Sequence, residues 1–374
     1  MAGIYIHIPF CKSKCIYCGF YSVRMPADRS AFLNALKKEM QLRNDYIDAV
    51  KYDTLYFGGG TPSLLDVTEL ADILDGIAQF FPLSKDAEIT LEANPEQLTP
   101  QYCNDLRTLC INRLSIGIQS FSDEALRFMG RRHTAAEAVA AVNNAAAAGF
   151  GNISVDLIYG VSERNDAQWV ADVERAMSLP VQHLSCYALT PEENSILYRR
   201  ICNRRHAPVD DDLAARQYDV LLQTLAGTSM RHYEVSNFAC PAFESKHNSS
   251  YWNHTPYLGL GPAAHSFDGK CRQWNPANIA RYLKNMEAGV DCEGRETLTE
   301  DDLYNETVLL RLRTCRGVDL GEVEKKFGTA RKSMLVDHFG QHYPERYFEK
   351  TENRLRLTDA GMWFADGIAA DLFV

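Results

Sequence analysis

The segment GIYIHIPFCKSKCIYC, residues 3–18, joins a short apolar strand to a loop that carries three cysteines. Cys11, Cys15 and Cys18 are spaced C-x3-C-x2-C, so one tight loop can place three thiolates on three corners of a [4Fe–4S] cube. Three ligands leave one iron open to a small molecule, whereas four would close the cluster. Zinc is the main alternative, but no fourth ligand stands at zinc-like spacing. The segment therefore predicts a reactive iron–sulfur site directly after the first strand.

Short apolar segments and helical patterns alternate through the first half of the chain. We expect strands at residues 3–8, 53–57, 88–92, 113–116, 153–158 and 183–187. Helices are expected at 28–43, after the capping box Asp66–Glu69 and after the capping box Thr134–Glu137. Repeated strand–helix units predict an α/β fold with a parallel sheet, closed as a barrel or open and doubly wound. Either arrangement gathers functional residues at the carboxyl ends of the strands.

This alternation stops near residue 230. Tyr233–Phe238 is expected to form one more strand, an aromatic and glycine-rich stretch runs from His247 to Phe267, and the pattern breaks near Glu293–Thr299. The tail reads as helix, helix, short strand pair and helix, which predicts a small α-rich module. We therefore expect three parts: a strand–helix domain over 1–235, a connecting segment over 236–298 and a C-terminal domain over 299–374.

Composition narrows the class of protein. The chain has 374 residues and a net charge of −10, which argues against nucleic acid or an anionic membrane as the main partner. No apolar run approaches the roughly 20 residues of a membrane helix, and no signal peptide precedes the first strand, so we expect a cytoplasmic protein. The odd number of cysteines, 11, argues against a disulfide framework.

Polar and glycine residues follow the predicted strands. The turn GGGTP at 58–62 lets the backbone approach a ligand closely, and it matches neither a dinucleotide-binding motif nor a phosphate-binding loop. Glu92 and Asp156 can hold the hydroxyl groups of a ribose, and Arg131 can pair with a carboxylate. Taken singly, each is more often a surface or capping residue. Together with Gln119 they form a set at consecutive strand ends, which predicts a ligand site.

A second candidate site is the segment HNSSYW at 247–252. A histidine beside aromatic residues can ligate haem iron. From the residues alone, His247 is more commonly a core histidine that hydrogen-bonds a backbone carbonyl. Both interpretations stay open at this point.

Taken together, these motifs resemble the radical S-adenosylmethionine (SAM) superfamily and, within it, the oxygen-independent coproporphyrinogen III dehydrogenase (HemN-like) family. The resemblance rests on IHIPFC at 6–11, GGGTP at 58–62, EANP at 92–95, SIGIQSF at 115–121 and DLIYG at 156–160. It implies a partial (β/α)6 barrel, similar to a TIM barrel, with a small α-rich C-terminal domain. It also implies a [4Fe–4S] cluster on Cys11, Cys15 and Cys18, and SAM contacts from Tyr5, Gly59, Gly60, Thr61, Glu92, Gln119, Arg131 and Asp156.

Two departures from the dehydrogenases make the chain similar to the HemW-type haem chaperones instead. Phe20 stands where the dehydrogenases carry a fourth cysteine, and their extension before the first strand is not seen here. The motif H-N-x-x-Y-W at 247–252 is linked to haem in that branch, which implies His247 as a haem ligand. The resemblance implies haem as cargo, a low-potential electron donor such as flavodoxin or ferredoxin, and haem-accepting respiratory proteins. The alternatives are oxidative decarboxylation of coproporphyrinogen III to protoporphyrinogen IX, or SAM cleavage on an unrelated substrate.

Overall fold

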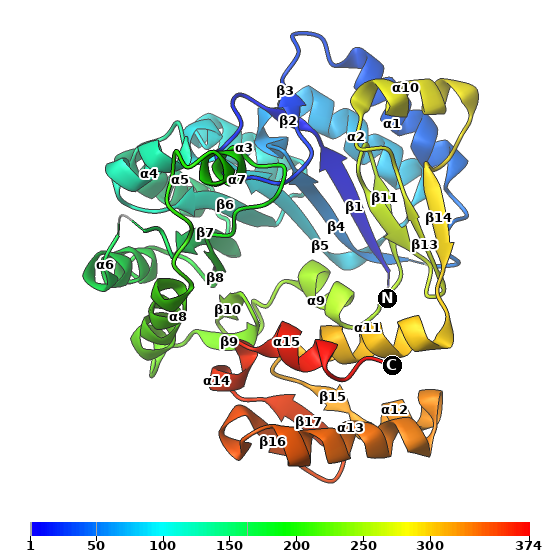
Figure 1. The fold of residues 1–374 in the computed structure, drawn as a ribbon. Helices are drawn as coiled ribbons and strands as arrows, with labels where there is room; N and C mark the ends of the chain where they lie inside the picture. Colours follow the sequence, from blue (N-terminus) through cyan, green and yellow to red (C-terminus); the bar gives the residue numbers. More distant parts are fainter. Residues whose placement is uncertain (1, 50, 163) are drawn as a thin grey trace.

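The computed structural model describes residues 2–49, 51–162 and 164–374, and a twisted sheet of twelve strands forms its centre (Figure 1). The strand order is β14-β13-β12-β11-β1-β4-β5-β6-β7-β8-β10-β9, so the sheet curls without closing into a full ring. Adjacent strands from β1 to β8 pair in parallel. This partial barrel confirms the predicted fold class. Its six successive parallel strands are β1 (Gly3–Ile8), β4 (Tyr52–Gly59), β5 (Leu83–Ala93), β6 (Arg113–Gln119), β7 (Ile153–Tyr159) and β8 (His183–Ala188).

Helices separate these strands and cover the outer face of the sheet. Both predicted capping boxes form: Asp66 accepts a hydrogen bond from the Glu69 amide at 2.9 Å, and Thr134 accepts one from the Glu137 amide at 3.2 Å. Such caps satisfy amides that the first helical turn leaves unpaired. The helices are α1 (Ser30–Leu42), α2 (Val67–Phe80), α3 (Pro100–Thr108), α4 (Asp123–Met129), α5 (Ala135–Ala147), α6 (Asp166–Met177), α7 (Ile196–Cys202) and α8 (Asp211–Leu225).

The chain after residue 230 differs from the sequence-based expectation. Tyr233–Phe238 does not form one strand, because the chain reverses at Val235-Ser236 and makes the antiparallel pair β9 (Arg231–Glu234) and β10 (Asn237–Ala239). The aromatic, glycine-rich stretch supplies β11 (Tyr257–Leu260) and β12 (His265–Phe267). β13 (Cys271–Trp274) follows it, and β14 (Gly294–Thr297) lies where the pattern break was expected. These strands extend the main sheet beyond β1. Helices α9 (Lys246–Trp252) and α10 (Ile279–Ala288) lie in the predicted connecting segment, residues 236–298.

The tail packs around its own apolar core below the sheet (Figure 1). Its predicted second helix is in fact two, because Gly328, at φ 87°, separates them. The predicted strand pair has a third member, β15, which pairs with β17. The elements are α11 (Glu300–Leu312), β15 (Val318–Asp319), α12 (Leu320–Phe327), α13 (Thr329–His342), β16 (Phe348–Lys350), β17 (Arg354–Leu357), α14 (Asp359–Met362) and α15 (Ala365–Ala370).

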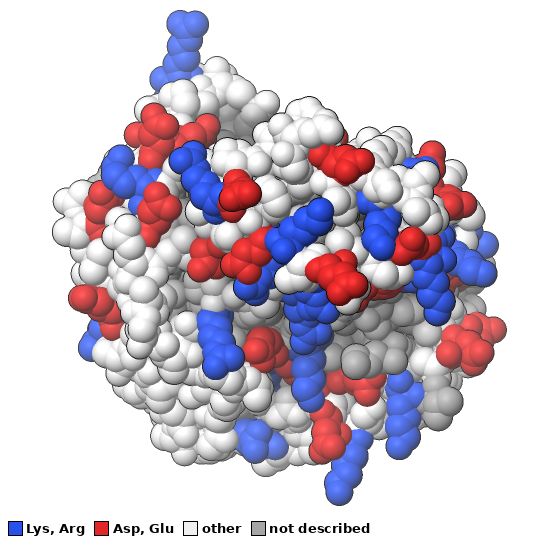
Figure 2. Space-filling model, turned by 90° about the horizontal axis from the view of Figure 1, so that it is seen from below, with Lys and Arg blue, Asp and Glu red and all other residues white. Residues whose placement is uncertain are grey.

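The face seen from below these C-terminal elements carries Lys and Arg interspersed with Asp and Glu (Figure 2). Over the ranges that the structure describes, we find no helix that combines the length and the apolar character needed to cross a membrane. The division at residues 235 and 298 stays a prediction.

Candidate functional site

The cysteine loop lies at the carboxyl end of β1, after the two-residue strand β2 (Phe10–Cys11). Backbone hydrogen bonds hold the loop from both sides: the Ile16 amide donates to the Met129 carbonyl at 3.1 Å, and the Leu197 amide donates to the Ile16 carbonyl at 2.7 Å. All three cysteines of the loop are half-buried, while Phe20 is 68% exposed. The loop is therefore anchored to α4 and α7 with its thiols still accessible.

Two side chains from other loops donate hydrogen bonds toward the thiols. Thr61 Oγ1 lies 3.6 Å from Cys11 Sγ, and Arg131 Nη1 lies 3.6 Å from Cys15 Sγ. Hydrogen bonds to sulfur are one means by which a protein tunes an iron–sulfur cluster. Within the described ranges, no three His, Cys, Asp or Glu side chains converge to hold one metal ion. In a [4Fe–4S] cube each thiolate binds a different iron, so the three sulfurs need not converge on one ion. Cys11, Cys15 and Cys18 therefore fit a [4Fe–4S] cluster.

A row of polar side chains crosses the sheet below this loop. The backbone register pairs Tyr5 with Tyr56, and Glu92 with Ser115. Tyr56 donates to Glu92 Oε1 at 2.8 Å, the Gly59 amide lies 3.2 Å from Glu92 Oε2, and Ser115 donates to Asp156 at 3.1 Å. The structure thus brings the predicted Tyr5, Glu92 and Asp156 onto one face. Asp156 lies in the middle of β7 rather than near its end.

Burial in this row raises the pKa of the Glu92 carboxyl to about 7 and that of Asp156 to about 6. Desolvation is the main cause for both groups, because a charged carboxylate is disfavoured away from water. The charge of Asp156 also raises the pKa of Glu92. Two acids that titrate near neutral pH are typical of a functional site.

Glycine in the turn at 58–60 is required by packing within the chain itself. Gly59 has φ 103°, and a Cβ there would lie 2.5 Å from the His7 ring. A Cβ on Gly60 would lie 2.8 Å from the Ile8 carbonyl oxygen. The turn therefore sits tightly against β1 and the start of the cysteine loop. The predicted SAM contacts of Gly59, Gly60 and Thr61 stay predictions.

Gln119 ends β6 in an unusual backbone conformation. Its φ is 71°, in the left-handed region that residues other than glycine rarely adopt, and the pairing with β7 shifts by one residue at this point. Arg131 approaches the same place, since its Nη2 bonds the Gly117 carbonyl and Asn94 Oδ1, the latter at 2.7 Å. Strained backbone of this kind clusters at functional sites. The structure therefore brings the predicted Arg131, which contacts Cys15, to Gly117 in β6, close to the predicted Gln119.

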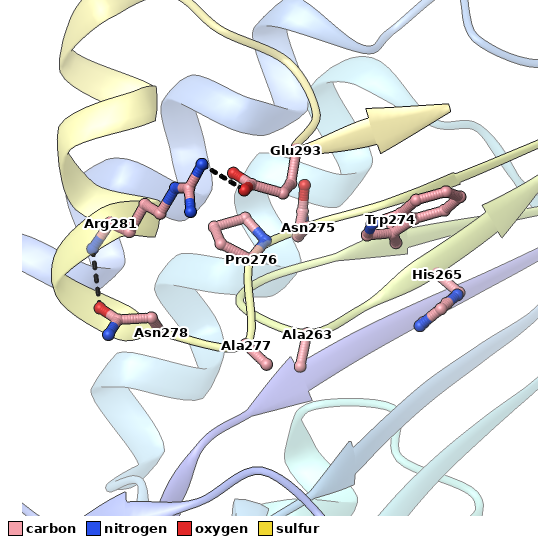
Figure 3. A pocket seen from close by; sticks show the side chains of 9 residues that line it. All are labelled: Ala263, His265, Trp274, Asn275, Pro276, Ala277, Asn278, Arg281 and Glu293. Carbon is pink, nitrogen blue, oxygen red and sulfur yellow. Dashed lines mark hydrogen bonds and ion pairs between the residues drawn. The ribbon is translucent and has the colours of Figure 1, made fainter. Parts of the chain in front are cut away.

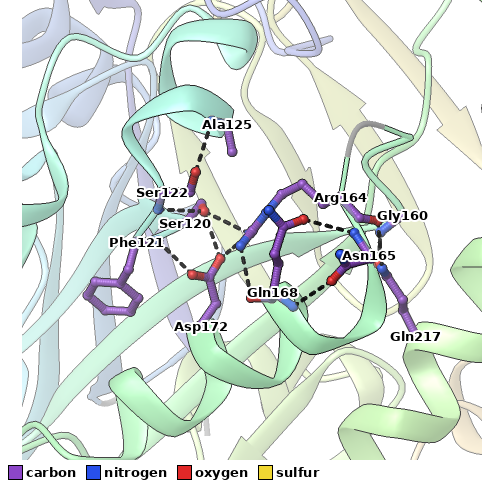
Figure 4. A network of polar contacts seen from close by, with 10 residues as sticks. All are labelled: Ser120, Phe121, Ser122, Ala125, Gly160, Arg164, Asn165, Gln168, Asp172 and Gln217. Atoms are coloured by element: carbon purple, nitrogen blue, oxygen red, sulfur yellow. Dashed lines mark hydrogen bonds and ion pairs between the residues drawn. The ribbon is translucent and has the colours of Figure 1, made fainter.

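A buried network fixes the chain directly after Gln119 (Figure 4). Asp172 accepts a hydrogen bond from Ser120 Oγ at 2.7 Å and one from the Phe121 amide at 3.1 Å. Arg164 forms an ion pair with the same carboxylate and donates to Ser120 Oγ at 2.9 Å. Asp172 and Arg164 are both buried. The network therefore holds the end of β6 against α6.

Removing one partner of this buried pair should destabilise the protein strongly. Asp172→Ala leaves the Arg164 guanidinium buried without its counter-charge, so we expect a loss of about 3–5 kcal/mol in the free energy of unfolding. Asp166→Ala, on the same helix, breaks the exposed pair with Arg216 and should cost under about 1 kcal/mol. Urea denaturation measures both. Equal losses in the two variants would contradict the network.

The Glu92 carboxyl makes stability depend on pH. Its pKa rises from 4.5 to about 7 in the folded protein, so the folded state keeps a proton that the unfolded chain has released. Stability therefore falls as pH rises from about 4.5 to about 7. In Glu92→Gln this loss is absent, so the variant should melt above the wild type at about pH 8, with the gap narrowing as pH falls from about 7 to about 4.5. Thermal melts of ligand-free protein across this range test it, and a gap independent of pH would contradict it.

His247 lies at the other end of the barrel, on α9. Its side chain is 1% exposed, its Nδ1 is 2.8 Å from Thr54 Oγ1, and its Nε2 is 2.8 Å from Tyr251 Oη. The ring stacks on Tyr56 at 4.9 Å, and burial lowers the pKa of His247 to about 3. Both ring nitrogens therefore have partners in this conformation. The structure does not bring His247 to the cysteine loop.

Two cavities lie outside the row of polar residues. One of about 20 Å³ touches Cys15, Asn94 and Arg131. The other, of about 400 Å³, lies between α10 and the hairpin of β12 and β13 (Figure 3). The second cavity was not predicted from the sequence. The strands beside it, β12 and β13, are short and show no alternation of polar and apolar residues. Sequence reasoning also missed Tyr56 and Asn94 as partners of Glu92 and Arg131, although Asn94 stands in the quoted EANP motif.

Comparisons with known proteins agree with this architecture. The family model of the Radical SAM superfamily matches residues 5–176, and that of the HemN C-terminal domain matches residues 298–364. The chain is 35% identical to Heme chaperone HemW of Mycobacterium tuberculosis (strain H37Rv), over 99% of this chain and 94% of that protein. It is 32% identical to Heme chaperone HemW of Lactococcus lactis, over 97% and 95%. The solved structure of coproporphyrinogen III oxidase (HemN) from Escherichia coli superposes with a TM-score of 0.83 at 22% identity, over 100% of this chain and 90% of that one, which shows a shared fold.

The partial barrel, the three-cysteine loop and these matches define a protein of the radical SAM superfamily, a class that implies a [4Fe–4S] cluster and SAM. Sequence identity above 30% along nearly the whole length of both chains identifies the family within this superfamily. The chain belongs to the family of Heme chaperone HemW. This confirms the resemblance seen in the sequence motifs.

Proposed function

We propose that this protein is a radical SAM haem chaperone, which takes up haem and delivers it to other proteins. The observation that supports this most strongly is the full-length identity to proteins named Heme chaperone HemW. Phe20 points the same way, because a largely exposed aromatic side chain stands where the dehydrogenases carry a fourth cysteine. The likeness to HemN concerns the fold alone, so it does not favour the dehydrogenase reaction.

The cysteine loop would hold the cluster through Cys11, Cys15 and Cys18. Thr61 and Arg131, already within 3.6 Å of two of the sulfurs, would donate hydrogen bonds to the thiolates. Glu92 and Asp156 would accept hydrogen bonds from ribose hydroxyls, and Arg131 would balance the charge of a carboxylate. When bound, the cluster and SAM would supply one-electron chemistry, with the reduced cluster as the electron donor and SAM as the acceptor. Further SAM contacts would come from Tyr5, Gly59, Gly60 and Gln119.

Partners follow from the same proposal. Reducing the cluster would require a low-potential donor such as flavodoxin or ferredoxin, and haem-accepting respiratory proteins would receive the cargo. We place this exchange in the cytoplasm. His247 Nε2 lies 2.8 Å from the Tyr251 hydroxyl. His247 would therefore serve as a haem ligand only if this hydrogen bond breaks.

Haem titration and transfer test the proposal on one anaerobically prepared sample. We expect saturable binding of haem, seen in the Soret band, and movement of the bound haem to an apo-haemoprotein separated by chromatography. The same sample, given SAM, reductant and coproporphyrinogen III, should form no protoporphyrinogen IX. Product formation without haem binding would overturn the proposal in favour of an enzyme.

A further inference from the structure

The cysteine loop is basic in a protein that is acidic as a whole. Residues 11–27 contain Lys12, Lys14 and Arg24 and no Asp or Glu, whereas the chain carries a net charge of −10. All three of these basic residues are exposed. The positive charge therefore lies at the surface, around thiols that are themselves half-buried.

Two segments that adjoin the loop add further positive charge. The loop is anchored by backbone hydrogen bonds to α4 and α7, and the chain around both contacts is rich in arginine (Figure 1). Residues 127–132 hold three arginines and no acid, and residues 191–206 hold four arginines and two glutamates. The ring centroids of Phe128 and His206 lie 5.3 Å apart, so the two segments also meet each other. Together with residues 11–27 they form a surface that we call the basic rim.

The exposed cations of the basic rim are not neutralised by acids of the same chain. Within the part of the chain that the structure describes, none of them forms an ion pair with a carboxylate. In the C-terminal domain, by contrast, Arg313 pairs with Asp366 at 2.6 Å and Arg331 pairs with Asp301 at 2.5 Å. Unpaired charges of one sign attract a partner of the opposite sign and speed its association. The rim therefore suits an acidic partner.

Phe20 supplies an apolar centre to the basic rim. It lies two residues after Cys18, and its side chain is 68% exposed. A Cβ on the neighbouring Gly19 would lie 2.8 Å from the Glu192 side chain, so this end of the loop packs against the residues before α7. Aromatic and arginine side chains are enriched in the cores of protein interfaces. An exposed aromatic ring among unpaired cations is thus typical of a protein-docking surface.

A nucleic acid fits this surface less well than a compact acidic protein does. The basic rim holds ten Lys and Arg against two Glu, so the rest of the chain is more acidic than its net charge of −10 indicates. A strand that continued past the rim would meet repulsion, because phosphates need cations along their path. A small protein contacts about 800 Å² of its partner and need not extend beyond the rim.

We propose that the basic rim is the docking surface for a small acidic electron-transfer protein, with Phe20 at the centre of the contact. This rests on the part of the proposed function in which the cluster takes its electron from another protein. The reduced flavin of such a donor loses one electron and the cluster gains it, and no bond forms or breaks.

Binding of flavodoxin, a small acidic flavoprotein, to the anaerobically reconstituted full chain tests the surface. The dissociation constant should rise about tenfold or more between about 50 and about 300 mM salt, because salt screens exposed charges. Arg200→Glu combined with Arg204→Glu should raise it about tenfold or more at the lower salt concentration. The matched control is Lys325→Glu combined with Lys350→Glu, which makes the same change of charge at exposed residues of the C-terminal domain. This control should bind within about twofold of the wild type.

A second set of measurements separates docking from loss of the cluster. Phe20→Ala should speed the dissociation of flavodoxin about tenfold, because truncating an interface anchor acts mainly on the dissociation rate. Reduction of the cluster by illuminated deazaflavin, a small reductant that needs no docking surface, should match the wild type in both charge-reversal variants.

Three results would overturn the docking surface while leaving the haem-chaperone function standing. One is the absence of saturable flavodoxin binding, or binding that salt does not weaken. Another is an equal effect of the two charge-reversal variants. The third is binding of a DNA oligonucleotide that Arg200→Glu with Arg204→Glu abolishes while flavodoxin binding persists, which would assign the rim to nucleic acid. Absence of haem binding with intact flavodoxin docking would instead overturn the proposed function and leave the surface in place.

Discussion

Replacing Cys11, Cys15 or Cys18 with Ser is expected to abolish assembly of the cluster. Each thiolate would hold a different iron, and a serine hydroxyl is a poor substitute for a soft sulfur ligand. Bound iron and sulfide should fall from about four of each per chain to near zero in each single variant. Anaerobic reconstitution followed by iron and sulfide assays measures the loss.

Cys110→Ser provides the matched control, because Cys110 is an exposed free thiol remote from the loop in sequence. We expect this variant to bind iron and sulfide as the wild type does. Since the loop cysteines are only half-buried, their serine variants should stay folded, with melting temperatures near that of the wild type. A cluster that survives in any loop variant would contradict the ligand assignment and the function built on it.

Replacing His247 with Ala is expected to lower the free energy of unfolding by about 3–5 kcal/mol. The change empties a fully enclosed ring position and leaves Thr54 Oγ1 and Tyr251 Oη without their partner at 2.8 Å. The backbone amide of residue 247, which donates to Glu88 at 3.0 Å, is kept in the variant, so the loss comes from the side chain alone. Urea denaturation followed by circular dichroism measures the loss.

Two further variants separate the causes of this effect. Tyr251→Phe removes one hydrogen bond while keeping the ring, so it should cost about 1 kcal/mol. His342→Ala removes an exposed histidine and should change stability by less than about 0.5 kcal/mol. If His247→Ala proved as stable as His342→Ala, the ring would not be packed as described. A haem defect in His247→Ala is therefore informative only beside its unfolding curve.

Local patterns in the sequence predicted the parallel half of the fold. Each of the six parallel strands β1, β4, β5, β6, β7 and β8 contains a short run rich in apolar or β-branched residues, and the capping boxes at Asp66 and Thr134 mark the starts of α2 and α5. The hairpin at Tyr233–Phe238 and the strands β11–β14 escaped prediction. They are short, and they are stabilised by neighbours that lie far away in sequence, as Leu260 is beside Ile6.

The candidate site also combines residues that local sequence patterns predicted with contacts that they did not predict. Spacing was sufficient to predict the cysteine loop, and parallel strands bring their carboxyl ends to one edge, so Glu92 and Gln119 were expected together. Nothing local indicated that Arg131 lies against Cys15, because that contact spans 116 residues. The burial of His247 was equally hidden, since Thr54 is 193 residues away.

The sequence by itself determined the ligand chemistry of the loop and the alternation that makes a parallel sheet, because both depend on residues close together in the chain. Only the tertiary structure decided which histidine is accessible. That depends on packing between distant segments, which encloses His247 beneath the barrel and leaves His265 at the edge of a cavity.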